Sequence, residues 1–121
     1  MLMNSIAFIF KHPPHGSSSG REGLDALLAT AALSEDIGVF FIGEGVFHLL
    51  NSQQPKTIFA RDYIVAFKLL ELYDIENVYV CQQSLTTRGM LKEAMGDIAV
   101  KALSIAEIQM QLNGYDRIIS F

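Results

Sequence analysis

The chain holds a single cysteine, Cys81, within the stretch VYVCQQSL. The apolar residues before it predict a buried strand, and the polar residues after it predict a loop at the carboxyl end of that strand. Free cysteines are among the most buried residue types and usually act as small hydrophobic side chains, which favours a structural role. A thiol beyond a parallel strand, near the amides of a helix start and Arg88, would instead favour the nucleophilic thiolate. The residues alone leave both interpretations of Cys81 open.

Other side chains that could do chemistry follow the predicted strands, where ligands bind in open parallel sheets. They are His12, His15, Arg21, Gly43, Glu44, His48, Gln82 and Arg88. The two histidines nearest the amino terminus and Cys81 lack partners that would complete a metal site, and no G-x-S-x-G elbow is present. The sequence therefore predicts no metal and no hydrolase triad.

The first loop, KHPPHGSSSGREG, is rich in Gly and Ser and precedes a helix, as a phosphate-binding loop would. It matches neither the P-loop nor the dinucleotide-binding pattern. A helix cap on a mobile, exposed loop explains the same composition. We therefore expect no bound cofactor, with a nucleotide- or phosphate-binding module as the competing hypothesis.

Five short runs rich in Val, Ile and Phe supply the framework for these residues, and they predict strands. The runs span residues 5–10, 37–42, 77–81, 97–101 and 117–121. The second run is almost continuously hydrophobic, which is typical of a strand covered on both faces. Helical patterns alternate with the runs, so we expect one α/β domain over residues 1–121. Its architecture would be a three-layer α/β/α domain with a five-stranded parallel sheet.

Two of the predicted helices begin with a capping box, in which a Ser and a Glu three residues later satisfy each other's backbone N–H groups. Ser19 with Glu22 opens one helix, and Ser104 with Glu107 opens another. Shorter helices are predicted in the stretch EGVFHLLN and within residues 84–93. Helices of this kind would connect successive parallel strands.

The stretch ARDYIVAFKLLELYDI predicts a helix that is apolar around most of its circumference. An outer helix should present a polar face to water, and large apolar patches are rare on monomers. We therefore expect Tyr63, Phe67, Leu70 and Tyr73 to lie at a contact with another subunit. The same surface predicts self-association when the chain is expressed alone.

The net charge of the 121-residue chain is −4, and its basic residues form no cluster. This balance argues against direct nucleic-acid binding, which needs a positive surface for phosphate contacts. No apolar run approaches the roughly 20 residues that span a bilayer, and the first residues lack the pattern of a signal peptide. One cysteine cannot form an internal disulfide. We expect a cytoplasmic protein without membrane contact.

A family resemblance is carried by five stretches, PHGSSSGREGLDALLATAAL, VFFIGEGVFHLL, ARDYIVAFKLLELYDI, VYVCQQSLTTRG and YDRIISF. Together they resemble the TusC/DsrF branch of the DsrE-like sulfur-relay family over nearly the whole chain. The resemblance implies an α/β/α domain in a heterohexamer with TusB-like and TusD-like sister subunits. Such a complex receives persulfide sulfur from a TusA-like carrier and passes it to a TusE-like carrier, toward 2-thiolation of the tRNA wobble uridine. The alternative implied by the DsrF likeness is a role in intracellular sulfur oxidation.

The same resemblance bears on Cys81, because the family assigns the sulfur-carrying cysteine to the TusD/DsrE-type subunit. That cysteine lies in a segment similar to VYVCQQSLTTRG. We therefore expect Cys81 at the corresponding place, in a subunit that is structural rather than sulfur-carrying. An active sulfurtransferase that uses Cys81 is the alternative.

Overall fold

A computed structural model of the chain describes residues 5–13, 19–33, 36–49, 75–90 and 100–121. Its elements are β1 (Ser5–Phe10), α1 (Ser19–Ala31), β2 (Asp36–Phe41), the 3-10 helix η1 (Gly43–Leu49), β3 (Asn77–Cys81), α3 (Gln82–Thr87), β4 (Lys101–Leu103), α4 (Ile105–Asn113) and β5 (Arg117–Ser120). The strands form one sheet in the order β4-β3-β2-β1-β5, and every neighbouring pair is parallel. The α/β fold with a five-stranded parallel sheet is therefore confirmed.

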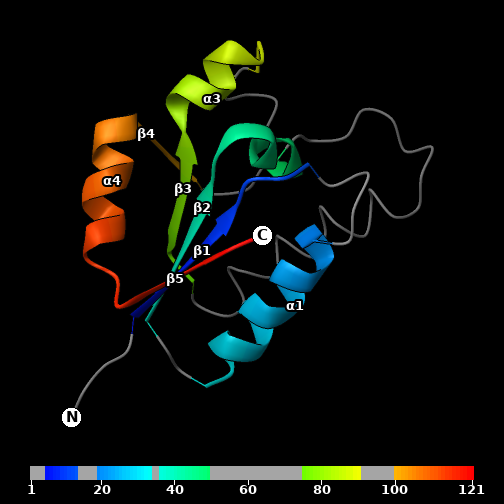
Figure 1. Cartoon of the computed structure of the whole chain (residues 1–121), viewed down its shortest axis with the longest axis vertical. Helices are drawn as coiled ribbons and strands as arrows, with labels where there is room; N and C mark the ends of the chain where they lie inside the picture. The colour runs from blue at the N-terminus through cyan, green and yellow to red at the C-terminus, as the bar shows by residue number, and fades with distance from the viewer. Residues whose placement is uncertain (1–4, 14–18, 34–35, 50–74, 91–99) are drawn as a thin grey trace.

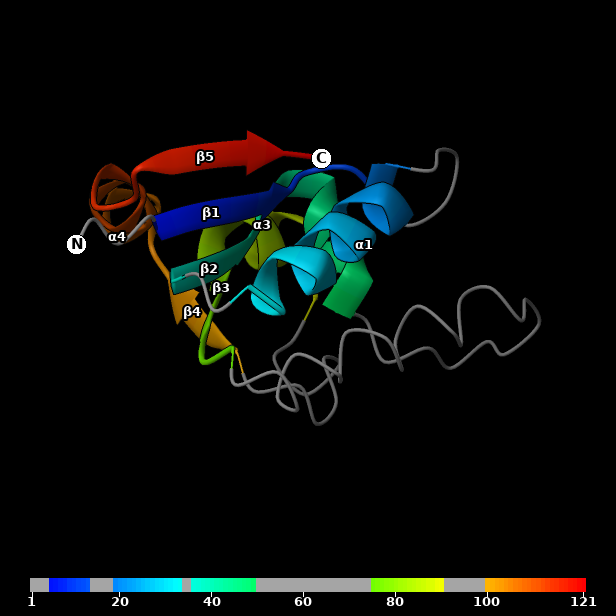
Figure 2. The same ribbon diagram turned by 90° about the horizontal axis from the view of Figure 1, so that it is seen from below.

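Helices cover both faces of the sheet, with α1 on one side and α4 on the other (Figures 1 and 2). Alternate residues of β2 serve the two faces, because successive side chains of a strand point in opposite directions. Val39 belongs to the core on the α1 face and Phe40 to the core on the α4 face, and neither is exposed. A strand buried on both faces reads as a continuous apolar run, as the sequence predicted.

The two cores differ in size. The α1 face holds the larger cluster, in which Leu24 and Leu27 of α1 pack on Phe8 and Phe10 of β1. On the α4 face the cluster is smaller, and Ile108 is the buried residue that α4 contributes. Among the described residues, the α4 side of the sheet therefore has the smaller buried cluster.

The predicted bounds of β4 are wrong. A strand over residues 97–101 was expected, whereas β4 spans Lys101–Leu103 and residues 91–99 lie outside the described part of the chain. Strand pairing extends to Leu103 and ends there, because the next residue, Ser104, is the N-cap of α4. There the capping box is confirmed: Ser104 Oγ accepts from Glu107 N at 3.2 Å, and Ser104 N donates to Glu107 Oε1 at 2.9 Å. These hydrogen bonds lower the pKa of Glu107.

The turn after β2 brings η1 against the end of β1. Gly43 adopts a positive φ of 58°, a conformation that favours glycine. A Cβ on Gly45 would collide with the backbone carbonyl of Phe10, so only glycine fits there. A short helix was expected over the EGVFHLLN stretch, and η1 forms it as far as Leu49, the last described residue of that stretch.

Candidate functional site

Cys81 is the last residue of β3, and α3 begins at the very next residue. The loop predicted after the strand is therefore wrong, because a short helix follows without a break. The Cys81 side chain is 3% exposed and lies on the α4 face with Tyr79, Phe40 and Ile108. Burial among aromatic and aliphatic side chains is the usual setting of a structural cysteine.

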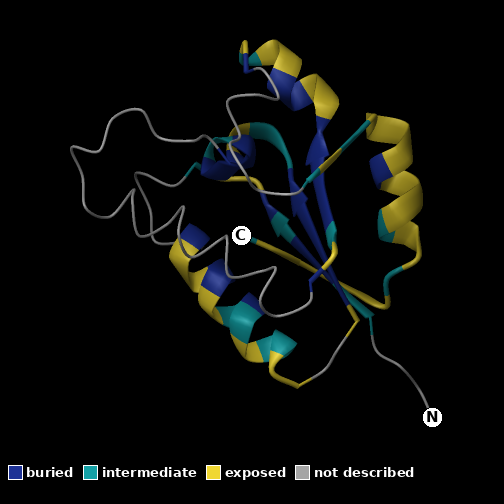
Figure 3. Cartoon of the chain, turned by 180° about the vertical axis from the view of Figure 1, so that it is seen from behind, coloured by how far each residue is buried: buried dark blue, intermediate teal, exposed yellow. Residues whose placement is uncertain are grey.

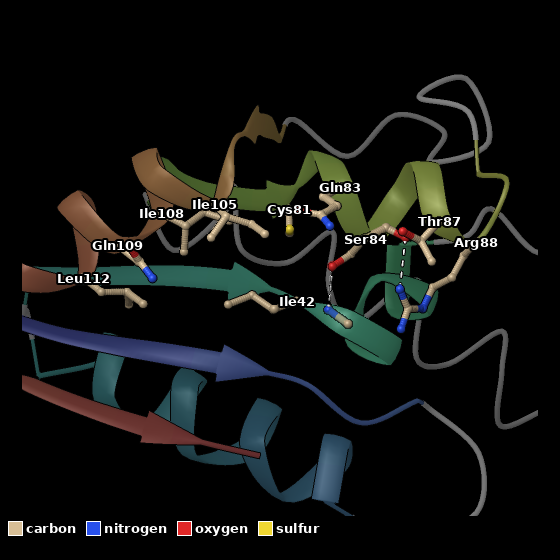
Figure 4. A pocket seen from close by; sticks show the side chains of 11 residues that line it. Ile42, Cys81, Gln83, Ser84, Thr87, Arg88, Ile105, Ile108, Gln109 and Leu112 are labelled. Carbon is tan, nitrogen blue, oxygen red and sulfur yellow. Dashed lines mark hydrogen bonds between the residues drawn. The ribbon is translucent and has the colours of Figure 1, made fainter.

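A pocket of about 400 Å³ nevertheless adjoins Cys81, beyond the carboxyl ends of β2 and β3 (Figure 4). Its wall is formed by Ile42, Gly43, Cys81, Gln83, Ser84, Thr87, Arg88, Ile105, Ile108, Gln109 and Leu112. The aliphatic residues come mainly from α4 and the polar ones mainly from α3. Both its volume and its place at the strand ends are typical of ligand sites in α/β proteins.

The polar end of the pocket is a hydrogen-bonded junction between α3 and η1. Ser84, which is 8% exposed, accepts a hydrogen bond from Gly43 N at 2.9 Å on its Oγ. Arg88 donates to the Ser84 carbonyl at 3.2 Å and forms an ion pair with Glu44 at 3.3 Å. Its Nε is buried and has no hydrogen-bond partner among the described residues. The guanidinium thus holds the loop after β2 against α3 beside Cys81.

Tyr115, just after α4, extends the cover of the same sheet face. Its ring meets Phe40 edge-on at a centroid distance of 5.8 Å, and its hydroxyl lies where a Cβ on Gly38 would be. Burial above all, together with the nearby Tyr79 and Asp36, raises the pKa of Tyr115 to about 12. Tyr115 is therefore neutral at physiological pH and packs as an aromatic side chain.

The remaining candidate residues from the sequence are distributed over other parts of the molecule. His48 is 2% exposed, and its Nε2 lies 2.8 Å from the carbonyl oxygen of His12, away from the pocket. Arg21 is exposed on α1, on the opposite side of the sheet. No cluster of three or more metal-ligating side chains occurs within the described ranges. Of the sequence candidates, Gly43, Cys81 and Arg88 line the pocket, and Glu44 adjoins it through its ion pair with Arg88.

Two predicted features fall outside the described residues. Residues 14–18 of the Gly/Ser loop, including His15, belong to an undescribed range. The proposed contact residues Tyr63, Phe67, Leu70 and Tyr73 all lie within 50–74, which is likewise not described. Their role at a subunit contact remains a prediction.

Sequence reasoning missed the contribution of α4 to the pocket. Ile105, Ile108 and Leu112 recur at helical spacing after the Ser104 cap, so they were identifiable as one face of a helix. Their spacing did not reveal that this face lies opposite Cys81, because that depends on how α4 returns across the sheet. Ser84 gave no signal of its own beyond following the predicted strand.

Comparisons with known proteins identify a family and a solved structure with the same fold. The DsrE/DsrF-like family profile matches residues 4–121. The chain belongs to the DsrE/DsrF-like family. It is 49% identical over 119 residues to "Protein TusC" of Klebsiella pneumoniae subsp. pneumoniae, with 98% of this chain and 100% of that protein covered. This DsrE/DsrF-like chain also superposes on the ychN protein from E. coli with a TM-score of 0.83. That structure is 20% identical, and the match covers 98% of this chain and 100% of the other, which shows a shared fold.

Within the residues that the structure describes, no helix of this DsrE/DsrF-like chain is both long and apolar enough to cross a membrane.

Proposed function

We propose that the chain is a subunit of a cytoplasmic sulfur-relay complex that passes persulfide sulfur toward 2-thiolation of the tRNA wobble uridine. It would form a single DsrE/DsrF-like domain over residues 1–121 and assemble with TusB-like and TusD-like sister subunits. The near full-length similarity to the Klebsiella protein named TusC carries this proposal. TusA-like and TusE-like carriers would contact the assembled complex rather than this chain directly.

Within that complex we assign this chain a structural role. The supporting observation is the surroundings of Cys81, which is 3% exposed and packed with Tyr79 and Ile108 in an apolar cluster. A relay thiol must be reached by the attacking sulfur of its partner, and a buried thiol resists such exchange. The sulfur-carrying step would belong to a sister subunit.

A second candidate function is sulfur transfer by Cys81 itself, and the adjoining pocket is the observation that favours it. The pocket gives the thiol an approach from the carboxyl end of the sheet, past Ile105 and Gln83 (Figure 4). In this case the Cys81 thiolate would attack the outer sulfur of a donor persulfide and form a new persulfide, while the donor leaves as a thiolate. A thiolate of the acceptor would then take the outer sulfur in the same way and release Cys81 as a thiolate. If the chain instead acts in intracellular sulfur oxidation, its complex would have the same subunit architecture but would exchange sulfur with other partners.

The deciding experiment is Cys81→Ser in the assembled complex, with wobble-uridine thiolation measured in cells. Cys81→Ala is the matched control, because it keeps the site apolar while removing the sulfur. A complex that lacks the cysteine of the TusD-like subunit provides the reference for complete loss. Light scattering confirms that each variant complex keeps its mass.

Normal thiolation with both variants is the expected result, and it would support a structural subunit. Loss of thiolation with an intact complex would make Cys81 the sulfur carrier and refute the structural assignment. Mass spectrometry after incubation with a persulfide donor adds a direct readout, namely one extra sulfur atom on the peptide that contains Cys81. Absence of any complex with TusB-like and TusD-like chains would refute the proposed assembly itself.

A further inference from the structure

The pocket beside Cys81 changes in polarity along its length. In Figure 4 the aliphatic side chains of α4 line one end, Thr87 and Arg88 line the other, and Cys81 lies between them. Among the residues that form the wall, Arg88 is the one that carries a charge. A cavity that is mainly apolar and has a single cationic end suits a ligand with the same two parts.

The aliphatic end of the pocket leaves apolar surface open to water. Ile105 lines the pocket and is 46% exposed, and α4 is mostly yellow in Figure 3. Ile105, Ile108 and Leu112 form a row on α4, and this row is about 10 Å long at 1.5 Å per residue. A hydrocarbon chain laid along the row would remove the exposed surface of Ile105 from water, which is favourable.

The charged end of the pocket has hydrogen-bonding capacity for an anion. A guanidinium group carries five N–H donors, and Arg88 uses Nη1 on the Ser84 carbonyl and Nη2 on Glu44. Its Nε is buried without a hydrogen-bond partner among the described residues. Arginine binds carboxylates through charge-assisted hydrogen bonds, often two at a time. A carboxylate is therefore the anion that this end of the pocket fits.

Glu44 already contacts Arg88, but it is not part of the pocket wall. The two side chains meet at a single distance of 3.3 Å, and the Glu44 side chain is 51% exposed. Ion pairs as exposed as this one contribute little, because water screens them. A second carboxylate can therefore bind the same guanidinium from the pocket, in competition with Glu44.

We propose that the pocket binds a small aliphatic carboxylate, with the carboxylate on Arg88 and the hydrocarbon chain along Ile105, Ile108 and Leu112. The volume of about 400 Å³ is near the lower end for ligand pockets, which limits the ligand to the size of hexanoate or octanoate. Such binding does not depend on whether Cys81 carries sulfur. The proposal and the sulfur-relay function can therefore fail separately.

Calorimetry on the full-length chain tests both parts of the ligand. From butanoate to octanoate, each added methylene group should lower the dissociation constant about fourfold, as expected for burial of a CH₂ group. Hexanamide has the same chain as hexanoate without the charge, and it should bind at least about tenfold more weakly because a charge-assisted hydrogen bond is lost. Equal affinity for hexanoate and hexanamide, or no binding of any of the acids, would overturn the proposal.

Substitutions of opposite sign assign the carboxylate to Arg88. Arg88→Gln should weaken hexanoate binding at least about tenfold and leave hexanamide binding nearly unchanged, with the exposed Arg117→Gln as its control. Glu44→Gln removes the competing carboxylate and should tighten hexanoate binding about threefold. A purely structural role of the ion pair would weaken binding in both variants, which would contradict the proposal. If Arg88→Gln does not fold, the two ligands compared on the unmodified chain still decide.

Cys81 reports the place of the bound ligand, because it is the only cysteine of the chain. Hexanoate at about ten times its dissociation constant should slow the reaction of Cys81 with a neutral thiol reagent about tenfold, since an occupied pocket blocks the thiol. Ile105→Gln should weaken both binding and protection. Met110→Gln, at a residue that is 75% exposed and outside the pocket wall, should behave like the unmodified chain. Binding that leaves Cys81 equally reactive would place the ligand elsewhere and overturn the proposal.

Discussion

Ile108 is the residue through which α4 is anchored to the sheet, so its replacement by alanine tests the architecture of the site. Ile108 is 4% exposed, belongs to the same apolar cluster as Cys81, and forms part of the pocket wall. The other described residues of α4 are exposed or half-buried. Ile108→Ala should therefore weaken the docking of the helix and widen the pocket beside the thiol.

The magnitude follows from the atoms removed. Three methyl or methylene groups at about 0.8 kcal/mol each give about 2.4 kcal/mol of lost burial. A large additional cavity term is not expected, because the space adjoins an existing pocket that water can enter. Alanine has a higher helix propensity than isoleucine, which offsets about 0.4 kcal/mol of the lost unfolding free energy. The net loss of unfolding free energy is about 2 kcal/mol, which corresponds to about 8 °C in Tm.

Urea unfolding followed by circular dichroism measures this loss, with Met110→Ala as the matched control. Met110 lies on the same helix but is 75% exposed, so its replacement should change the unfolding free energy by less than about 0.5 kcal/mol. The same variants can be treated with a small uncharged thiol reagent, and Cys81 should react faster in Ile108→Ala. Equal stability of the two variants, with unchanged Cys81 reactivity, would refute the view that Ile108 closes the pocket.

Three further predictions concern the elements around the site. Gly45→Ala should lower the unfolding free energy by about 3 kcal/mol, because the new Cβ would meet backbone atoms that cannot rotate away. Gly114→Ala is the control and should cost far less, because Gly114 has an ordinary helical φ of −83°. Chemical denaturation of both variants measures the difference. Ser84→Ala should cost about 1–2 kcal/mol in the same assay, because Gly43 N loses its acceptor; a neutral result would contradict the η1–α3 junction. The Tyr115 hydroxyl has a folded pKa of about 12, above the unfolded value of about 10, so its contribution to stability is complete below pH 10 and is lost as the pH rises through 12. Tyr115→Phe should reduce this alkaline loss, and an identical pH profile for both proteins would exclude Tyr115 as its source.

Much of the framework followed from local patterns in the chain. The strand bounds of β1 and β3 agree with the apolar runs at 5–10 and 77–81, because a run of β-branched and aromatic residues suits a buried strand in any context. The start of α4 was predictable because both halves of the Ser104–Glu107 capping box lie within four residues of each other. The apolar run before Cys81 placed it at a strand end, and the alternation of side chains along a strand puts it on the face of Tyr79.

The tertiary structure decided the surroundings of residues whose neighbours come from distant parts of the chain. The pocket exists because α4, over twenty residues after Cys81, returns to the same face of the sheet and places Ile105 and Leu112 opposite it. The exposure of Ile118 depends on the strand order, which puts β5 at an edge although its apolar sequence reads like that of a central strand. The end of β4 was likewise set by the N-cap of α4 rather than by hydrophobicity. The local sequence specifies which residues form a helix or a strand. The neighbours of each element and the burial of its side chains arise from long-range packing, and no short sequence pattern encodes which elements pair.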